Sequence, residues 1–580
     1  MIVPMKRLML LCVADDSDST LERLRDLGAV HIELTHEGGS LGVAAKDGLE
    51  RAERAVRTVL KASKEIARAG GGGAQAHAGI GVDEILALDE KLETLKGEAE
   101  TLRAAIRRYE PFGDFDPALV KRLADAGVKV RLHDDGSYDF LYGDEEPEDR
   151  PGTRILPLPV ERLSATRAKL SETEAEMQSI TDSIAAADAD AIMRSFPGLR
   201  DAVSFALAKD ELLGSRIAEG EVSAPQIAFV RGWLPADMVA ELESAAKECG
   251  WGIALRDPNP DETPPTLIRP PKLFRPVKAL FEGLGIAPAY SEADVSVPFM
   301  CYFSLFFAML VGDGGYGAII LALTLFGWKK YLAAKKPAAA MKSWLTLLTV
   351  FSSATVLWGL LSNTWFGAGL PFAAEWPTVK WLGDPTYNNM MLLCFTIGVS
   401  HLMLARIWTG CCMLNDRTCL SQFGWAGILL FMYLVTNSIV GIFSGIPEWA
   451  YWMFGVSLAL VFGFTLKGSE LKSRGIELGM LPLNIMSALG DIISYVRLFA
   501  VGLASVKVAQ NFNDMATGLD LPLWLKVVPM VLILLVGHGL NFAMAGLSIL
   551  VHAVRLNTLE FSNHKGVSWA GYAFSPFRKH

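Results

Sequence analysis

The sequence predicts an α-helical polytopic membrane domain of about eight transmembrane helices, preceded by an α+β domain with a long helical hairpin and two small α/β lobes. The chain has 580 residues, and charged side chains are frequent up to about residue 278. From about residue 297, long apolar runs rich in Trp, Phe and Met recur, as is typical of polytopic membrane proteins. A proline-rich linker is predicted at 257–296.

The proximal lobe is predicted from residues 1–40 and 220–256. Its first residues, 5–13, have the composition of a buried strand. A capped helix at 19–27 and a second strand at 29–34 follow. This start is therefore predicted to be a β-α-β unit.

A helical arm is predicted from two charge-rich stretches, 41–110 and 159–219, in which apolar residues form sparse stripes. These stretches enclose a distal lobe at 111–158. The glycine run at 70–73 lacks the lysine and hydroxyl residue of a phosphate-binding loop, and a linker is the preferred interpretation. The lobes and the arm together form a soluble domain at 1–256.

The transmembrane domain is predicted at 297–565, with a C-terminal tail at 566–580. Its eight apolar segments lie at about 297–311, 314–331, 343–366, 388–410, 421–444, 449–467, 480–512 and 523–560. The first segment is short. It is either a full span or one arm of a re-entrant hairpin that turns at 312–315.

The positive-inside rule orients these segments. Connections on the side of the soluble domain carry Lys329, Lys330, Lys335, Lys336, Lys342, Arg417, Lys467, Lys472, Arg474, Lys565, Arg578 and Lys579. The opposite connections carry Lys380 alone. The soluble domain and both termini are therefore expected to be cytoplasmic.

Several functional classes are disfavoured by the sequence. The seven cysteines have no paired metal-ligand spacing, and no clustered basic face suggests a nucleic-acid partner. No Walker motif is present. We therefore expect no metal, no cofactor, no nucleic-acid partner and no catalysis by this chain alone.

Two arginines lie inside the last apolar segments. Arg497 is near the middle of 480–512 and Arg555 is deep in 523–560. A charge at mid-membrane costs about 3 kcal/mol on insertion scales, so it suggests a functional site. The alternative is an arginine that snorkels to the interface.

Polar residues accompany both arginines at helical spacing, which places them on one face of each segment. One face carries Asn484, Ser487, Asp491, Ser494 and Arg497, and the other carries His538, Asn541, Ser548, His552 and Arg555. Facing polar stripes suggest a path for a small ion, with Asp491 and His552 as relays. The alternative for the Ser, Asn and His side chains is hydrogen bonding between neighbouring helices.

Five motifs occur in an order that resembles a known family. They are Met5-Lys6-Arg7, Gly232-Trp-Leu-Pro235, Phe306-Phe-Ala-Met-Leu-Val-Gly-Asp-Gly-Gly-Tyr-Gly317, Ser494-Tyr-Val-Arg497 and His552-Ala-Val-Arg-Leu-Asn-Thr-Leu-Glu-Phe561. Over nearly its whole length the chain resembles the large membrane subunit of V-type and archaeal-type rotary ATPases, called subunit I in prokaryotes and subunit a in eukaryotes.

The resemblance implies a stator that couples proton or sodium translocation to rotation and to ATP hydrolysis or synthesis. The implied partners are a proteolipid c/K ring, peripheral stalk subunits of the E and G/H type, central-stalk and other Vo subunits, and membrane lipids. It also implies that the last two membrane helices are long and tilted against the ring. Arg497 would face the ion-binding carboxylate of the ring, and Arg555 would be its companion. The implied location is a bacterial or archaeal plasma membrane.

The chain departs from the family pattern at three positions. Ser505 stands where eukaryotic relatives carry a histidine, Ala545 where they carry a glutamate, and His552 where some prokaryotic relatives carry a glutamine. These departures leave the exit-channel groups open. The candidates for these groups are Asp491, Glu470, Glu477, His538 and Glu560.

Two other functions compete with this interpretation. A secondary ion transporter with a regulatory domain would show an internal repeat of the membrane half, and we see no convincing repeat. A membrane-anchored scaffold would tolerate replacement of Arg497. The residues do not distinguish a proton from a sodium path.

Overall fold

The structure is a computed structural model that describes residues 2–35, 39–68, 80–142, 154–215, 226–334, 339–465, 479–519 and 522–579. It divides into two compact units. One unit comprises Met1–Arg7, Trp233–Asp237 and Arg256–Ser575, and the other comprises Leu8–Gly232, Met238–Leu255 and Pro576–His580. The glycine run at 70–73 lies outside the described residues.

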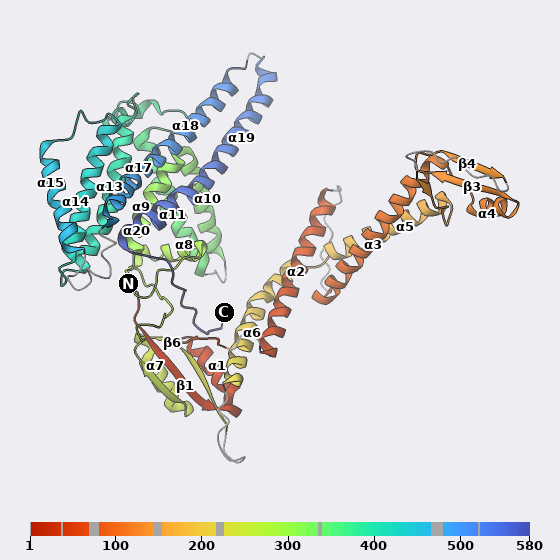
Figure 1. Cartoon of the computed structure of the whole chain (residues 1–580), viewed down its shortest axis with the longest axis horizontal. Helices are drawn as coiled ribbons and strands as arrows, with labels where there is room; N and C mark the ends of the chain where they lie inside the picture. The colour runs from red at the N-terminus through yellow and green to blue at the C-terminus, as the bar shows by residue number, and fades with distance from the viewer. Residues whose placement is uncertain are drawn as a thin grey trace. The chain divides into compact units, whose positions relative to one another are not determined.

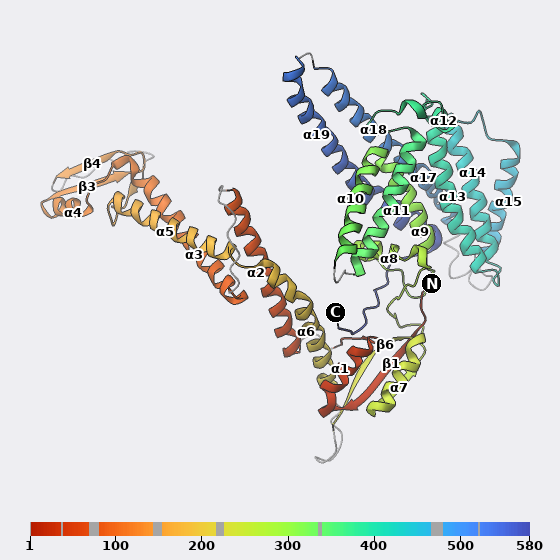
Figure 2. The ribbon, with the colours of Figure 1, turned by 180° about the vertical axis from the view of Figure 1, so that it is seen from behind.

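A four-stranded sheet has the order β2-β6-β1-β7. Its strands are β1 (Met5–Val13), β2 (His31–Ile32), β6 (Ile227–Pro235) and β7 (Gly252–Arg256). Two helices, α1 (Ser17–Leu27) and α7 (Val239–Cys249), connect strands and lie beside the sheet in both views (Figure 1, Figure 2). Gly28 ends α1 because its φ of 57° is the left-handed conformation that glycine adopts at low cost.

The unit that contains Leu8–Gly232 continues as two helix pairs. The helix α2 (Ser40–Arg68) packs with α6 (Ala189–Gly214), and α3 (Val82–Tyr109) packs with α5 (Leu163–Ala185) (Figure 1). A narrow apolar seam joins them, and it includes Ala55, Val59, Ile85, Leu92, Ile180 and Ile184. The seam is narrow because the sequence supplies apolar residues on one stripe of each helix.

A small lobe lies at the end of α3 and α5. It contains α4 (Pro117–Asp125) and a three-stranded sheet of order β4-β3-β5. The strands are β3 (Val128–His133), β4 (Tyr138–Tyr142) and β5 (Ile155–Leu156). The carboxylate of Asp116 accepts a hydrogen bond from the Ala118 N–H and so caps α4.

The helices of the other unit are mostly apolar. In chain order they are α8 (Val277–Leu284), α9 (Ser296–Val311), α10 (Gly314–Ala333), α11 (Ala339–Ser362), α12 (Pro377–Leu382), α13 (Asn388–Cys412), α14 (Cys419–Ile439), α15 (Glu448–Phe464), α17 (Leu481–Ser494), α18 (Val496–Thr517), α19 (Leu523–Ser548) and α20 (Ser562–Lys565).

Five helical stretches in the described part of the chain are long and apolar enough to cross a membrane. They are Ala340–Ser362, Asn388–Cys412, Cys419–Ile439, Leu481–Thr517 and Trp524–Lys565. The apolar helices Ser296–Val311 and Glu448–Phe464 are shorter. A count of eight full spans therefore stays a prediction.

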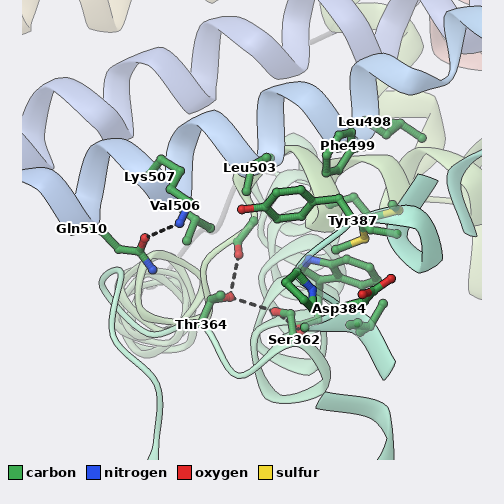
Figure 3. Close-up of a pocket in the computed structure, with 18 residues that line it drawn as sticks. Ser362, Thr364, Asp384, Tyr387, Leu498, Phe499, Leu503, Val506, Lys507 and Gln510 are labelled. Atoms are coloured by element: carbon green, nitrogen blue, oxygen red, sulfur yellow. Dashed lines mark hydrogen bonds between the residues drawn. The ribbon is translucent and has the colours of Figure 1, made fainter. Parts of the chain in front are cut away.

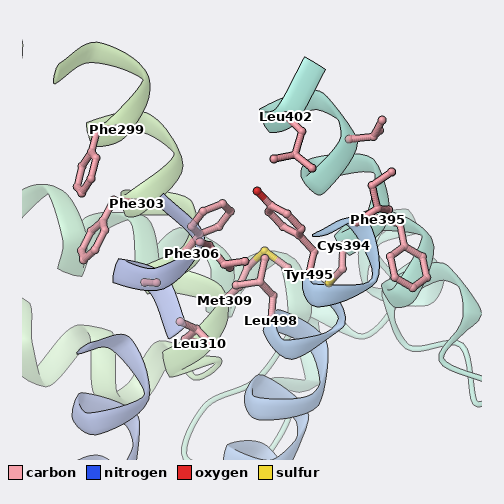
Figure 4. Packing of buried hydrophobic residues seen from close by; sticks show 14 of the residues in the cluster. Phe299, Phe303, Phe306, Met309, Leu310, Cys394, Phe395, Leu402, Tyr495 and Leu498 are labelled. Carbon is pink, nitrogen blue, oxygen red and sulfur yellow. The ribbon is translucent and has the colours of Figure 1, made fainter. Parts of the chain in front are cut away.

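An aromatic core joins α9 to α13 and α17–α18 (Figure 4). Phe299 and Phe303 stack along α9, and Phe306 contacts Tyr495 edge to face. A glycine lets α9 and α18 approach closely, because a Cβ at Gly502 would lie 2.5 Å from the Met309 carbonyl oxygen.

The last two apolar segments are not continuous α-helices. The segment predicted at 480–512 breaks between α17 and α18, where the Tyr495 N–H donates to the Ile492 carbonyl three residues back. The segment predicted at 523–560 ends in two π-helical turns, Ile549–Ala553 and Leu556–Phe561. Because a π-turn bonds residues i and i+5, it shifts the face on which every later side chain lies.

Candidate functional site

Arg497 lies at the second residue of α18, directly after the helix break. Its Nε donates to the carbonyl oxygen of Ser494 at 3.0 Å, and its Nη2 donates to Oε1 of Glu560 at 2.9 Å. Ser494 is the last residue of α17, and the negative end of a helix dipole favours a cation. The guanidinium is thus fixed by its own backbone and by one carboxylate.

Arg555 approaches the same carboxylate. Its Nε lies 3.4 Å from Oε1 of Glu560, and its side chain is 56% exposed, whereas that of Arg497 is 22% exposed and that of Glu560 is 6% exposed. Within the described residues, Oε2 of Glu560 has no hydrogen-bond partner. Two cations share one carboxylate, so the group keeps an excess positive charge on its exposed side.

The π-turn explains why the side chains of Arg555 and Glu560 lie close together. In an α-helix, side chains five residues apart point about 140° away from each other, since each residue turns about 100°. The π-turn at Leu556–Phe561 brings positions i and i+5 to nearly the same side. π-turns often occur at functional sites.

His552 lies close to the arginine cluster. Its ring interacts electrostatically with Arg497 and Arg555, and its buried Nδ1 has no partner among the described residues. The candidate stripe residue Ser494 instead donates to the carbonyl of Asp491 at 2.6 Å, a bond within its own helix. The structure therefore places His552 at the cluster and gives Ser494 a local bond.

A second polar network contains three of the predicted residues, Ser505, His538 and Asn541. Asn541 donates through Nδ2 to the Tyr316 hydroxyl at 3.0 Å and to the Ser505 carbonyl at 2.8 Å. The hydroxyl of Ser505 donates to Oδ1 of Asn541 at 3.2 Å. Asn541 is almost fully buried, and all of these bonds join α10, α18 and α19.

The bonds of this network have one consistent direction. Since Tyr316 accepts from Asn541, its own proton is directed to Nδ1 of His538, 2.8 Å away. His538 Nε2 then donates to Oδ1 of Asn513 at 3.1 Å. This assignment of the His538 tautomer follows from the network. Tyr316 and His538, which share one hydrogen bond, are the titratable side chains of this network.

A cavity of about 340 Å³ lies between α18 and the segment 362–387 (Figure 3). Its polar lining includes Thr364, Asp384, Lys507 and Gln510, and Tyr387 and Leu503 contribute to its apolar lining. The hydroxyl and backbone N–H of Thr386 donate to the Asp384 carboxylate and lower its pKa, so this group is ionised at neutral pH. The carboxylate favours cations at the cavity.

Asp491 lies apart from both networks. Its Oδ2 is 3.1 Å from Nε2 of His564, and Arg406 donates to the other nitrogen of that ring at 3.0 Å. Sequence reasoning missed Arg406, His564, Tyr316 and Asn513. Arg406 lies inside the apolar segment 388–410, so the rule that singled out Arg497 would also have found it.

The remaining candidates are placed as follows. Glu560 is the carboxylate at the arginines, whereas Glu470 and Glu477 lie outside the described residues. The stretch Trp524–Lys565 carries Arg555 and Glu560, and only 11% of the 18-residue apolar part used to identify it is buried within this chain.

Comparisons with known proteins place the chain among relatives of similar length. No family model matches it. The V-type ATP synthase subunit I 1 of Treponema pallidum is 29% identical over 100% of both chains. The V-type ATP synthase subunit I of Borreliella burgdorferi is 27% identical, also over 100% of both chains. The A-type ATP synthase subunit I of Methanocaldococcus jannaschii is 27% identical over 64% of this chain and 58% of its own length.

Proposed function

We propose that this chain, which is homologous over its whole length to proteins named V-type ATP synthase subunit I, is the membrane stator subunit of a rotary ATPase. It acts as a non-catalytic subunit of an ATP synthase complex. Its function is to carry an ion through the membrane at the contact with a rotating partner. Its soluble part and both termini lie on the cytoplasmic side.

The observation that supports this role most directly is the group formed by Arg497, Arg555 and Glu560. It lies within the two longest apolar stretches, where a charge without a function is costly. An arginine stays charged at every relevant pH, and a nearby cation stabilises the ionised form of a carboxylate. A partner carboxylate that arrives at this group therefore releases its ion.

The fixed charge also separates two access paths. Asp491 lies six residues before Arg497, and Ser505 lies eight residues after it, which corresponds to about 9 Å and about 12 Å of helix at 1.5 Å per residue. The ordered network around His538 serves one path and Asp491 serves the other. An ion cannot pass between them along the chain without meeting the guanidinium of Arg497.

The partner that receives the ion is a proteolipid ring. Apolar side chains of α19, among them Val528, Leu532 and Leu535, are more than 60% exposed within this chain. Uncovered apolar surface of this size fits lipid or another membrane protein. The exposed Arg555 lies in the same stretch, which places charge and apolar surface together.

The soluble unit holds the peripheral stalks. Its helix pairs are long, charged on their outer faces and joined by a narrow apolar seam. Such an arm presents a long, charged surface to partner helices. The E and G/H type stalk subunits are the proposed partners.

The test replaces Arg497 with glutamine in the assembled complex and measures ATP-driven ion uptake into inverted vesicles with proton and sodium probes. Loss of uptake of at least about tenfold is expected, because a neutral side chain no longer stabilises the partner carboxylate. Arg417→Gln is the matched control, since Arg417 is an exposed arginine in the connection between α13 and α14. Unchanged uptake in Arg497→Gln would leave a membrane-anchored scaffold as the function.

A further inference from the structure

A cluster of three titratable side chains on α13, α17 and α20 has a buried histidine at its centre. Asp491 Oδ2 is 3.1 Å from His564 Nε2, and Arg406 Nε is 3.0 Å from His564 Nδ1. His564 is 5% exposed and Asp491 is 27% exposed. Four segments distant in the sequence meet here, since Arg406 Nη1 also donates to Oε1 of Gln422 on α14 at 3.1 Å.

The hydrogen bonds determine which nitrogen of His564 carries the proton. A guanidinium only donates, so Nδ1 of His564 must accept from Arg406 and holds no proton. Nε2 therefore carries the proton and donates to Asp491. His564 is thus held as one neutral tautomer, with its Nε2–H directed at the Asp491 carboxylate.

The charges around His564 lie on α13, α17 and α20, and the π-turn Leu556–Phe561, which also packs on α20, carries Glu560. Asp491 is on α17, Arg406 is on α13, and Lys565 is the next residue of α20. The Lys565 ammonium lies over the Trp408 ring at 4.7 Å and donates to the Thr409 hydroxyl at 3.3 Å. The ring of His401 also interacts electrostatically with His564. Arg406 additionally contacts the Trp425 ring at 5.1 Å.

Arg406 makes two contacts that would remain if its Nε moved away from His564. Its Nη1 bond to Gln422 and its contact with Trp425 do not involve His564. A small displacement toward those two groups would free Nδ1 of the imidazole. The ring would then have one nitrogen open to a proton and the other already bonded to Asp491.

We propose that His564 relays protons to and from Asp491 and that Arg406 controls access to the relay. A proton from water binds Nδ1 once Arg406 has moved, and the Nε2 proton passes to the Asp491 carboxylate. Asp491 becomes a neutral carboxylic acid, and His564 is left neutral with its proton on Nδ1. The reverse sequence returns the proton. The inference rests on the proposed function and names a proton as the ion on this path, because a sodium ion cannot move by bond exchange.

The test compares His564→Gln and His564→Asn in the assembled complex, with ATP-driven proton and sodium uptake measured from about pH 5 to pH 8, where histidine changes charge. The side-chain amide of glutamine extends about as far as Nε2 of histidine, and that of asparagine about as far as Nδ1. Neither amide titrates, so each variant keeps one hydrogen-bonding position and loses the proton relay. Asp491→Asn, which leaves His564 unaltered and still accepts its hydrogen bond, removes the proton acceptor. His31→Gln, the same change in the soluble unit, is the control.

We expect proton uptake to fall at least about tenfold in all three variants, as for the loss of a general acid–base group. We also expect the unaltered complex to show an inflection in this pH range and the His564 variants to lose it. A merely structural role would lower the amplitude and keep the inflection. Uptake within twofold of the unaltered complex, with the same pH profile, would overturn the relay.

Arg497→Gln is measured in parallel to separate the two proposals. Loss of uptake in Arg497→Gln with normal uptake in the His564 variants would disprove the relay alone. Normal uptake in Arg497→Gln would disprove the proposed function, and the relay with it. Sodium uptake that persists in the His564 variants would likewise contradict the assignment of a proton.

Discussion

At the scale of single residues, Glu560 decides the electrostatics of the candidate site. It is nearly buried, it accepts a hydrogen bond from Arg497, and it also lies within ion-pair distance of Arg555. A buried ion pair adds little net stability when formed, but removal of one partner is costly because the remaining charge stays buried. Glu560 therefore keeps the two arginines side by side despite their repulsion.

Replacement of Glu560 by glutamine should destabilise the chain by less than the about 3–5 kcal/mol that is lost with one partner of a fully buried pair, because Arg497 is partly exposed and Arg555 is more than half exposed. The melting temperature of the purified complex measures this effect, and proton uptake should fall with it. Glu375→Gln is the control, because its exposed pair with Lys380 contributes about 0–1 kcal/mol. Equal melting temperatures for the two variants would contradict the role given to Glu560.

At the scale of elements, the position of Arg497 depends on how closely α18 packs on α9. The Gly502 backbone lies against the Met309 carbonyl, and the Cβ of any other residue would approach that oxygen to 2.5 Å. Backbone atoms cannot move aside as a flexible side chain can. The close approach therefore requires glycine at this position, five residues after the arginine.

Gly502→Ala should separate α9 from α18 and lower stability by about 1–3 kcal/mol, the typical cost of overpacking. Thermal unfolding of the detergent-solubilised complex tests this value. Gly539→Ala is the matched control, since a Cβ there has no neighbour within 4 Å. That control should be neutral, or stabilising by up to about 1 kcal/mol from helix propensity. A Gly502→Ala variant as stable as the control would show that α9 and α18 can move apart at little cost.

At the scale of the whole molecule, the helix pairs α2–α6 and α3–α5 form an arm that has only a narrow apolar seam as its core. Between α3 and α5, exposed ion pairs such as Lys91–Glu176 and Arg103–Glu174 accompany the apolar seam. Exposed pairs of this kind contribute about 0–1 kcal/mol each. An arm of this construction gains its stiffness from partners, which agrees with the proposed contact to peripheral stalks.

Removal of the distal lobe should uncouple ATP hydrolysis from ion transport. The Tyr109 hydroxyl donates to the Pro157 carbonyl at 2.9 Å, so a short Gly-Ser linker can replace residues 111–156. The amount of ion taken up per ATP hydrolysed should fall at least about twofold in vesicles that contain the assembled complex. A linker inserted at the same place with the lobe retained is the control. An unchanged ratio would exclude the lobe as a stator contact.

The sequence by itself determined the class of the molecule. The change in composition near residue 297, the apolar runs and the ordered motifs are local properties, and they led to a membrane chain homologous to subunit I. Arg497 and Arg555 were also found from the sequence, because a charge in an apolar run is visible without any structure. The domain boundaries, the membrane orientation and the ion path stay predictions.

Only the tertiary structure decided which groups meet. Spacing at 3.6 residues per turn could not reveal that π-turns bring Glu560 to Arg555, or that the helix breaks before Arg497. Nor could it reveal that Arg406 and Asp491 share His564, since these three residues come from segments up to 158 positions apart. Periodicity fixes the face of one regular helix, whereas contacts between helices depend on breaks, π-turns and glycines that place one backbone against another.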